Sequence, residues 1–132
     1  MGALFEAVAT GKVGPLNGTR LFAMGISSGG FMTSRMAVSY PGKFRSLAVH
    51  SRSYATCGAT CTVPRPLPAD HPPTLFLHGG SDSVVPVSAM ESYRDALAAE
   101  GHVVDSVVDP SAGHEWLATG PSAIRSWFDA HP

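Results

Sequence analysis

The chain has 132 residues, and nine lysines and arginines against ten aspartates and glutamates give it a formal net charge of −1. This length is typical of one domain with one hydrophobic core, so we expect residues 1–132 to form a single domain. The balanced charge and the lack of a basic run argue against nucleic acid or an anionic membrane surface as a partner. No run approaches the roughly 18 apolar residues of a membrane span.

The sequence carries few signals of cellular location. Its first residues lack the charged and apolar regions of a signal peptide, so the chain as written predicts a soluble, cytoplasmic protein. Its two cysteines, Cys57 and Cys61, form either a local disulfide, which would indicate an oxidising compartment, or a pair of free thiols. They lack the two further ligands that a zinc site needs, so we expect no metal.

Short apolar runs alternate with longer amphipathic segments, which is the pattern of βα units on a parallel sheet. We expect strands at 20–24, 47–50, 74–78 and 103–108, and helices at 28–40, at 86–100 and near the C-terminus. Residues 52–73 show no helical period and are expected to form an ordered loop. The predicted fold class is α/β, with about four mostly parallel strands flanked by helices.

Apolar residues at helical spacing predict which helix faces are buried. They are Met32, Met36 and Tyr40 in the first long helix, and Met90, Tyr93 and Leu97 in the second. The start of the second helix stays open: Ser88 with Glu91 resembles a capping box, whereas Pro86 suits the first helical position.

One pentapeptide carries a chemical signal. Residues 25–29, Gly-Ile-Ser-Ser-Gly, match the G-x-S-x-G turn that lifts a serine hydroxyl above the end of a strand. We expect both glycines to be required, because the turn brings the backbone and the following helix too close for side chains. The match follows an apolar strand and opens an amphipathic helix, so it predicts Ser27 as a nucleophile.

A nucleophilic serine needs a base, because its hydroxyl is not ionised near neutral pH. His114 follows the last predicted strand and Asp82 follows the strand before it. The loops at the carboxyl ends of parallel strands open on one edge of the sheet, so these side chains can meet Ser27 there. His78 is the rival base and Asp109 the rival acid. Asp82 also suits a turn or a helix cap without chemistry.

Three segments resemble the esterase and polyhydroxyalkanoate-depolymerase branch of the α/β-hydrolases, which includes feruloyl-esterase-like proteins. They are residues 22–44, with the serine motif and a Tyr-Pro-Gly-Lys-Phe run, residues 77–86, Leu-His-Gly-Gly-Ser-Asp-Ser-Val-Val-Pro, and residues 113–116, Gly-His-Glu-Trp. The chain order Ser, Asp, His is the one that this superfamily uses. The resemblance implies a minimal α/β-hydrolase fold without a cap domain.

The resemblance also implies a serine carboxylic-ester hydrolase that needs no cofactor. Ser27 would attack the ester carbonyl, His114 would carry the proton, and Asp82 would orient the imidazole. The backbone N–H of Ser28 would supply one oxyanion-hole donor. We expect small or extended esters as substrates, including polyesters and aryl esters. Three aromatic residues are expected to line an open cleft: Phe31, Tyr54 and Trp116.

The chain departs from the family pattern on its N-terminal side. The usual fold has about eight strands and takes a second oxyanion donor from a loop near its third strand. This chain matches only the C-terminal half of that sheet, so we expect the serine-bearing strand at a sheet edge. Residues 1–18, with a short helix at 3–9, would cover this edge, or a second subunit would pair with it. We expect a homo-oligomer, most simply a dimer, whose partner chain supplies the missing donor.

Two other readings remain open at this point. The chain matches only half of a hydrolase, so it could be a non-catalytic remnant that serves as an interaction module. A peptidase or a thioesterase would use the same triad.

Overall fold

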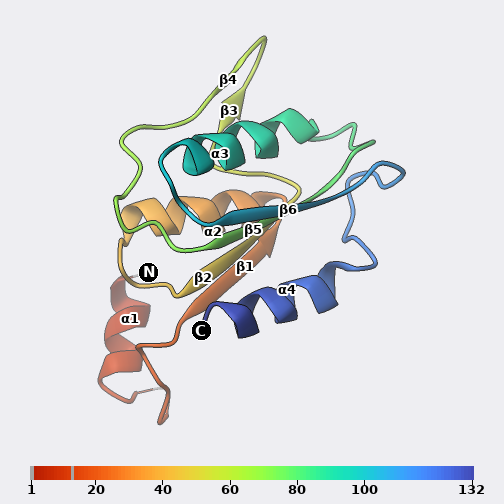
Figure 1. Ribbon diagram of the computed structural model, residues 1–132. Helices are drawn as coiled ribbons and strands as arrows, with labels where there is room; N and C mark the ends of the chain where they lie inside the picture. The colour runs from red at the N-terminus through yellow and green to blue at the C-terminus, as the bar shows by residue number, and fades with distance from the viewer. Residues whose placement is uncertain (1, 13) are drawn as a thin grey trace.

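The computed structural model describes residues 2–12 and 14–132. Within these residues the chain forms four helices and six strands, arranged as Figure 1 shows. Their bounds are α1 Gly2–Ala9, β1 Phe22–Ile26, α2 Ser28–Ser39, β2 Ser46–His50, β3 Thr56–Cys57, β4 Cys61–Thr62, β5 Thr74–Gly79, α3 Val87–Ala99, β6 Val104–Asp109 and α4 Gly120–Ala130.

Four strands form one parallel sheet in the order β1-β2-β5-β6, which confirms the predicted α/β class. The register places Ile26 of β1 beside His50 of β2, and His50 beside Leu77 of β5. Gly79, the last residue of β5, pairs with Asp109, the last residue of β6. The strands therefore finish together, and the loops that follow them share one edge of the sheet.

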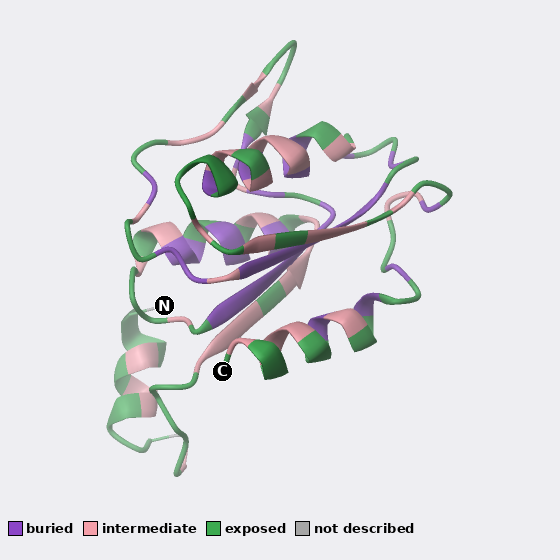
Figure 2. Cartoon of the chain, viewed as in Figure 1, coloured by how far each residue is buried: buried purple, intermediate pink, exposed green. Residues whose placement is uncertain are grey.

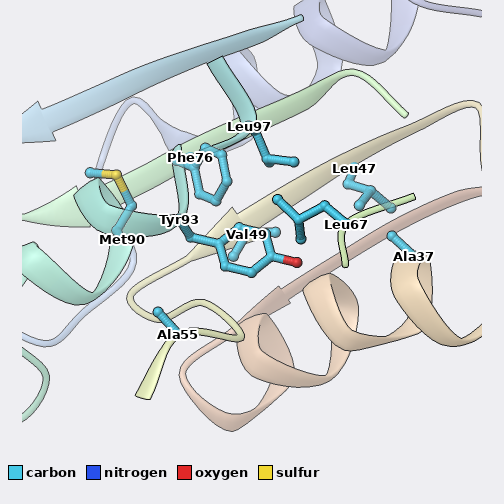
Figure 3. Packing of buried hydrophobic residues seen from close by; sticks show 9 residues of the cluster. All are labelled: Ala37, Leu47, Val49, Ala55, Leu67, Phe76, Met90, Tyr93 and Leu97. Carbon is cyan, nitrogen blue, oxygen red and sulfur yellow. The ribbon is translucent and has the colours of Figure 1, made fainter. Parts of the chain in front are cut away.

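One face of the sheet is covered by α2 and α3, and the other by α4 (Figure 1). The face toward α2 and α3 carries a buried cluster of nine residues, drawn in Figure 3: Ala37, Leu47, Val49, Ala55, Leu67, Phe76, Met90, Tyr93 and Leu97. The predicted face of α3 is thus confirmed, since Met90, Tyr93 and Leu97 are fully buried. Alternation along β2 sends Leu47 and Val49 to this face and Ala48 to the other.

The face toward α4 holds a smaller cluster: Ala48, Leu75, Leu77, Ala112, Leu117 and Ile124. Leu117 comes from the loop that contains His114, so the core of this face extends directly under that loop. Figure 2 shows the two central strands, β2 and β5, buried along their length, and every residue of both is buried. The carboxyl ends of the strands therefore follow directly from a buried, well-packed core.

Two predictions near the serine motif need correction. Strand β1 spans Phe22–Ile26 rather than residues 20–24, so the strand runs directly into Ser27. Met32 is half exposed and does not face the sheet. Helix α2 instead packs through the small residues Gly30, Thr33, Ser34 and Ala37 together with Met36. Small side chains allow α2 to lie close to the sheet, which the count of apolar residues could not indicate.

The segment between β2 and β5 contains more structure than the predicted loop. Strands β3 and β4 pair as a short antiparallel hairpin, and a disulfide joins Cys57 to Cys61 across it. The disulfide settles the alternative that the sequence left open. At the start of α3, Pro86 is the N-cap residue, so neither predicted start is correct.

The N-terminal helix is present as expected, but it leaves β1 open. Phe5 of α1 packs edge-on against Tyr40 and Phe44, near the end of the sheet where β1 begins (Figure 1). Met24, in the middle of β1, stays 50% exposed. Met1 and Val13 of the predicted covering segment lie outside the described residues. None of the helices in the described ranges has the length and apolar character of a membrane span.

Candidate active site

Ser27 occupies a strained turn between β1 and α2. Its backbone has φ 56° and ψ −118°, a conformation that residues other than glycine rarely adopt. The Ser27 N–H donates to the carbonyl of His50 on the neighbouring strand over 2.9 Å, and the Ser27 carbonyl accepts the Phe31 N–H. Bonds on both sides of the residue hold this conformation, as is common at functional sites.

The two glycines of the motif differ in how much space surrounds them. A Cβ on Gly25 would collide with the backbone of Gly29, so only glycine fits at position 25. A Cβ on Gly29 would meet nothing within 4 Å. The expectation that close approach requires both glycines therefore holds for Gly25 and is wrong for Gly29.

The structure brings Ser27, His114 and Asp82 together in one hydrogen-bonded chain. The Ser27 hydroxyl lies 2.8 Å from His114 Nε2, and His114 Nδ1 lies 2.7 Å from Asp82 Oδ2. An ionised carboxylate can only accept, so His114 carries its proton on Nδ1 and accepts the serine proton at Nε2. This arrangement can draw a proton from the serine as its oxygen attacks an electrophile.

Asp82 is held firmly by the loop that follows β5. Its Oδ1 accepts the backbone N–H groups of Val84 and Val85, each over 2.8 Å, while Oδ2 faces His114. Burial alone would raise the pKa of Asp82, but these hydrogen bonds from Val85, His114 and Val84 outweigh it and keep the pKa below its ordinary value. Asp82 is therefore a turn-forming residue and the histidine's partner at the same time.

The rival residues are occupied elsewhere. His78 is fully buried and its Nε2–H donates to the Val85 carbonyl over 2.9 Å, with Asp82 Oδ2 at 3.3 Å. It supports the Asp82 loop and does not contact Ser27. Asp109 accepts from the N–H and hydroxyl of Ser111 in its own turn. In the described part of the chain no group of three or more His, Cys, Asp or Glu side chains is arranged to hold a metal ion.

The aromatic residues expected around the site fall into two places. Phe31 and Tyr54 pack edge-on with ring centres 5.3 Å apart, one turn of α2 beyond Ser27. Trp116, two residues after His114, is 45% exposed and borders a cavity of about 610 Å³ between β1 and α4. Ser28 is the first residue of α2 and directly follows Ser27.

Sequence reasoning missed two residues beside the site. The Arg52 guanidinium lies over the Phe31 ring at 5.3 Å. His50 ends β2, is fully buried, and bonds to the loop that carries His114. A signal for His50 was available, because it is a polar residue at the carboxyl end of an apolar strand.

Several known proteins are similar to this chain in sequence or in structure. No family model matches the chain. A poly(3-hydroxyoctanoate) depolymerase from Pseudomonas fluorescens is 56% identical over 133 residues, covering 100% of this chain and 48% of that protein. Among solved structures, esterase PE8 aligns with a TM-score of 0.75 at 21% identity, covering 99% of this chain and 60% of that one.

A second solved structure is MGS-M1, an α/β hydrolase enzyme from a Medee basin deep-sea metagenome library. It aligns with a TM-score of 0.78 at 15% identity, over 97% of this chain and 61% of that one. The chain therefore has the α/β-hydrolase fold. The chain spans about half the length of the curated relatives that it matches. The depolymerase relative lies in the branch that the sequence motifs resemble.

Proposed function

We propose that the chain is a serine carboxylic-ester hydrolase. The observation that carries the proposal is the unbroken chain of hydrogen bonds from the Ser27 hydroxyl through His114 to the buried carboxylate of Asp82. Three residues from three separate loops meet with the geometry and the tautomer that nucleophilic catalysis requires.

The proposed reaction runs through an acyl-enzyme. Ser27 Oγ attacks the ester carbonyl carbon while its proton passes to His114 Nε2, and the imidazolium that forms is stabilised by Asp82. The tetrahedral intermediate collapses, the bond to the alkoxy oxygen breaks, and His114 returns the proton to the leaving alcohol. A water molecule then repeats these steps on the acyl-enzyme and releases the carboxylic acid.

We assign one oxyanion donor to the Ser28 backbone N–H, which follows the nucleophile directly. We propose that the second donor comes from a neighbouring polypeptide at the open edge of β1, next to Ser27. Removal of one such donor in other hydrolases lowers the rate by about 10²–10³, so this contact would matter.

For the substrate we propose a 3-hydroxyalkanoate ester or oligoester. The relative that is 56% identical is named for poly(3-hydroxyoctanoate), an aliphatic polyester. The cavity of about 610 Å³ beside Trp116 suits an aliphatic side chain because its lining is largely apolar: Met24, Trp116, Pro121, Ile124, Arg125, Phe128 and Asp129. Phe31 and Tyr54 would contact the substrate on the other side of Ser27.

The test compares the native chain with Ser27→Ala. We expect hydrolysis of p-nitrophenyl butyrate and of a 3-hydroxyoctanoate dimer by the wild type, with a burst of p-nitrophenol equal to one per active site. Ser27→Ala should lose at least about 10³ in kcat, since the residual rate comes from binding alone. Covalent labelling of Ser27 by a fluorophosphonate, located by mass spectrometry, gives a second readout.

Other outcomes identify the alternatives. Equal, slow hydrolysis by both proteins would show a non-catalytic interaction module. Cleavage of an acyl-CoA, or of a peptide, in preference to the oxygen esters would show a thioesterase or a peptidase on the same triad.

A further inference from the structure

His50 lies between the Ser27 turn and the loop that carries His114. It is the last residue of β2 and is fully buried. Its carbonyl accepts the Ser27 N–H over 2.9 Å, which ties it to the nucleophile turn. The side chain points to the face covered by α4, where the loop that carries His114 crosses the sheet. One residue therefore bonds both to the Ser27 turn and to the loop that carries His114.

The His50 imidazole accepts a hydrogen bond from the backbone of that loop. Its Nε2 accepts the backbone N–H of Leu117 over 3.1 Å, three residues after His114. The Trp116 ring packs against it with centres 4.8 Å apart. Because Nε2 must be unprotonated to accept, the proton sits on Nδ1 and is donated to Ser51 Oγ over 2.6 Å. The two partners thus fix one tautomer of His50.

The surroundings keep His50 neutral. Burial, the neighbouring His78 of β5 and His114 together lower its pKa to about 4, and the Asp82 carboxylate opposes them in part. These are the titratable groups that face His50 from β5 and from the loops after β5 and β6. At neutral pH the acceptor at Nε2 is therefore present in essentially every molecule.

We propose that His50 is a positioning residue for the triad: its neutral imidazole accepts the Leu117 N–H and so keeps His114 in line between Ser27 and Asp82. His50 touches no substrate and acts only through His114. The proposal rests on the proposed ester hydrolysis for its kinetic readout, but its structural readout does not need activity. A displacement of about 1 Å in a catalytic group can lower the rate about 10²-fold, so a lost anchor should be measurable.

The experiment compares two replacements of similar size. His50→Gln keeps an acceptor near the position of Nε2, whereas His50→Leu removes it. We expect kcat for p-nitrophenyl butyrate to fall about 30–100-fold in His50→Leu, with KM within about threefold, and to stay within about fivefold of wild type in His50→Gln. The low-field NMR signal of the His114 Nδ1 proton, held by Asp82, should be lost in His50→Leu and kept in His50→Gln.

His71→Leu is the matched control. His71 is also a buried histidine whose pKa burial lowers to about 4, but it lies before β5, at the opposite end of the sheet, beside Tyr93 and His102. Its loss should destabilise the fold without changing kcat or the His114 signal. If His50→Leu does not fold, Ser51→Ala replaces it, because it frees the tautomer of His50. We expect a three- to tenfold loss in kcat for that variant.

A folded His50→Leu with wild-type kcat and an unchanged His114 signal would overturn the proposal. Equal effects of His50→Leu and His71→Leu on every readout would also overturn it, since they would show only general destabilisation. If the wild type hydrolyses no ester, the proposed function fails, and the NMR signal alone then decides the role of His50.

Discussion

The carboxyl end of the sheet and the outer edge of β1 are built in opposite ways. At the carboxyl end, Ser27, His50, Asp82 and His114 are joined by hydrogen bonds of 2.7 to 3.1 Å, all made within the chain. Along the edge of β1 the side chains are apolar, and Met24 stays half exposed between two cavities of about 610 and 380 Å³.

The opposite edge of the sheet makes the contrast clearer. Strand β6 carries Asp105 and Asp109, and charges of this kind discourage pairing with another strand. Strand β1 carries none. The hydrogen bonds that join Ser27, His114 and Asp82 are thus made within this chain, while β1 leaves an apolar edge exposed. We keep a homo-oligomer that pairs or covers β1 as a proposal.

The largest effect should come from replacing Asp82 at the carboxyl end of the sheet. In Asp82→Asn the side chain keeps its shape, but its amide favours the wrong tautomer of His114. In a serine protease the equivalent change lowers kcat about 10⁴-fold, and we expect a loss of that order here. Steady-state kinetics with p-nitrophenyl butyrate measure it. A loss of less than tenfold would assign the acid role elsewhere, with Asp109→Asn as the control that should leave the rate unchanged.

Met24→Lys tests the edge of β1. A charge between the two apolar cavities should prevent association and so remove the proposed second oxyanion donor, with a loss in kcat of about 10²–10³. Light scattering and kinetics at the same protein concentration measure both effects. Val103→Lys, at an exposed apolar position beside β6, is the matched control and should change neither. A wild-type monomer with full activity would contradict the proposal.

Acid should weaken the fold before it protonates most carboxylates. Burial lowers the pKa values of His50 and His71 from 6.5 to about 4, so the unfolded chain binds protons in this interval that the native state does not. Stability is therefore complete above about pH 6.5 and falls toward pH 4, by at most about 3 kcal/mol per histidine. Urea unfolding at pH 7.5, 5.5 and 4.5 measures the change. Equal free energies of unfolding at these pH values would contradict it, and His71→Gln should remove part of the slope.

Gly79→Ala should give the smallest of these effects. A Cβ on Gly79 would collide with the carbonyls of Ala112 and Gly113 in the His114 loop. We expect a loss in stability of about 2 kcal/mol from this overpacking, together with reduced kcat as the loop moves. Thermal unfolding checks it, and Gly58→Ala, where a Cβ would meet nothing within 4 Å, is the control. A Gly79→Ala protein as stable as Gly58→Ala would show that the loop yields easily.

Much of the fold could be predicted from the sequence, because apolar residues are spaced differently in buried strands and in helices. The runs at 47–50 and 74–78 are confirmed as β2 and β5, each extended by one residue at one end. The buried face of α3 followed from spacing alone. Met32 was misplaced because α2 packs through small residues, which carry no apolar signal.

The sequence by itself determined the residue types and the order of the site. The strand–turn–helix pattern around Ser27, and the positions of Asp82 and His114 after later strands, are local features that a linear pattern can carry. Only the tertiary structure decided that His114 lies within 2.8 Å of both Ser27 and Asp82, that the cysteines are joined, and that His50 bonds to the His114 loop. Those contacts join residues 4 to 87 positions apart, and strand register and packing, rather than local sequence, bring most of them together.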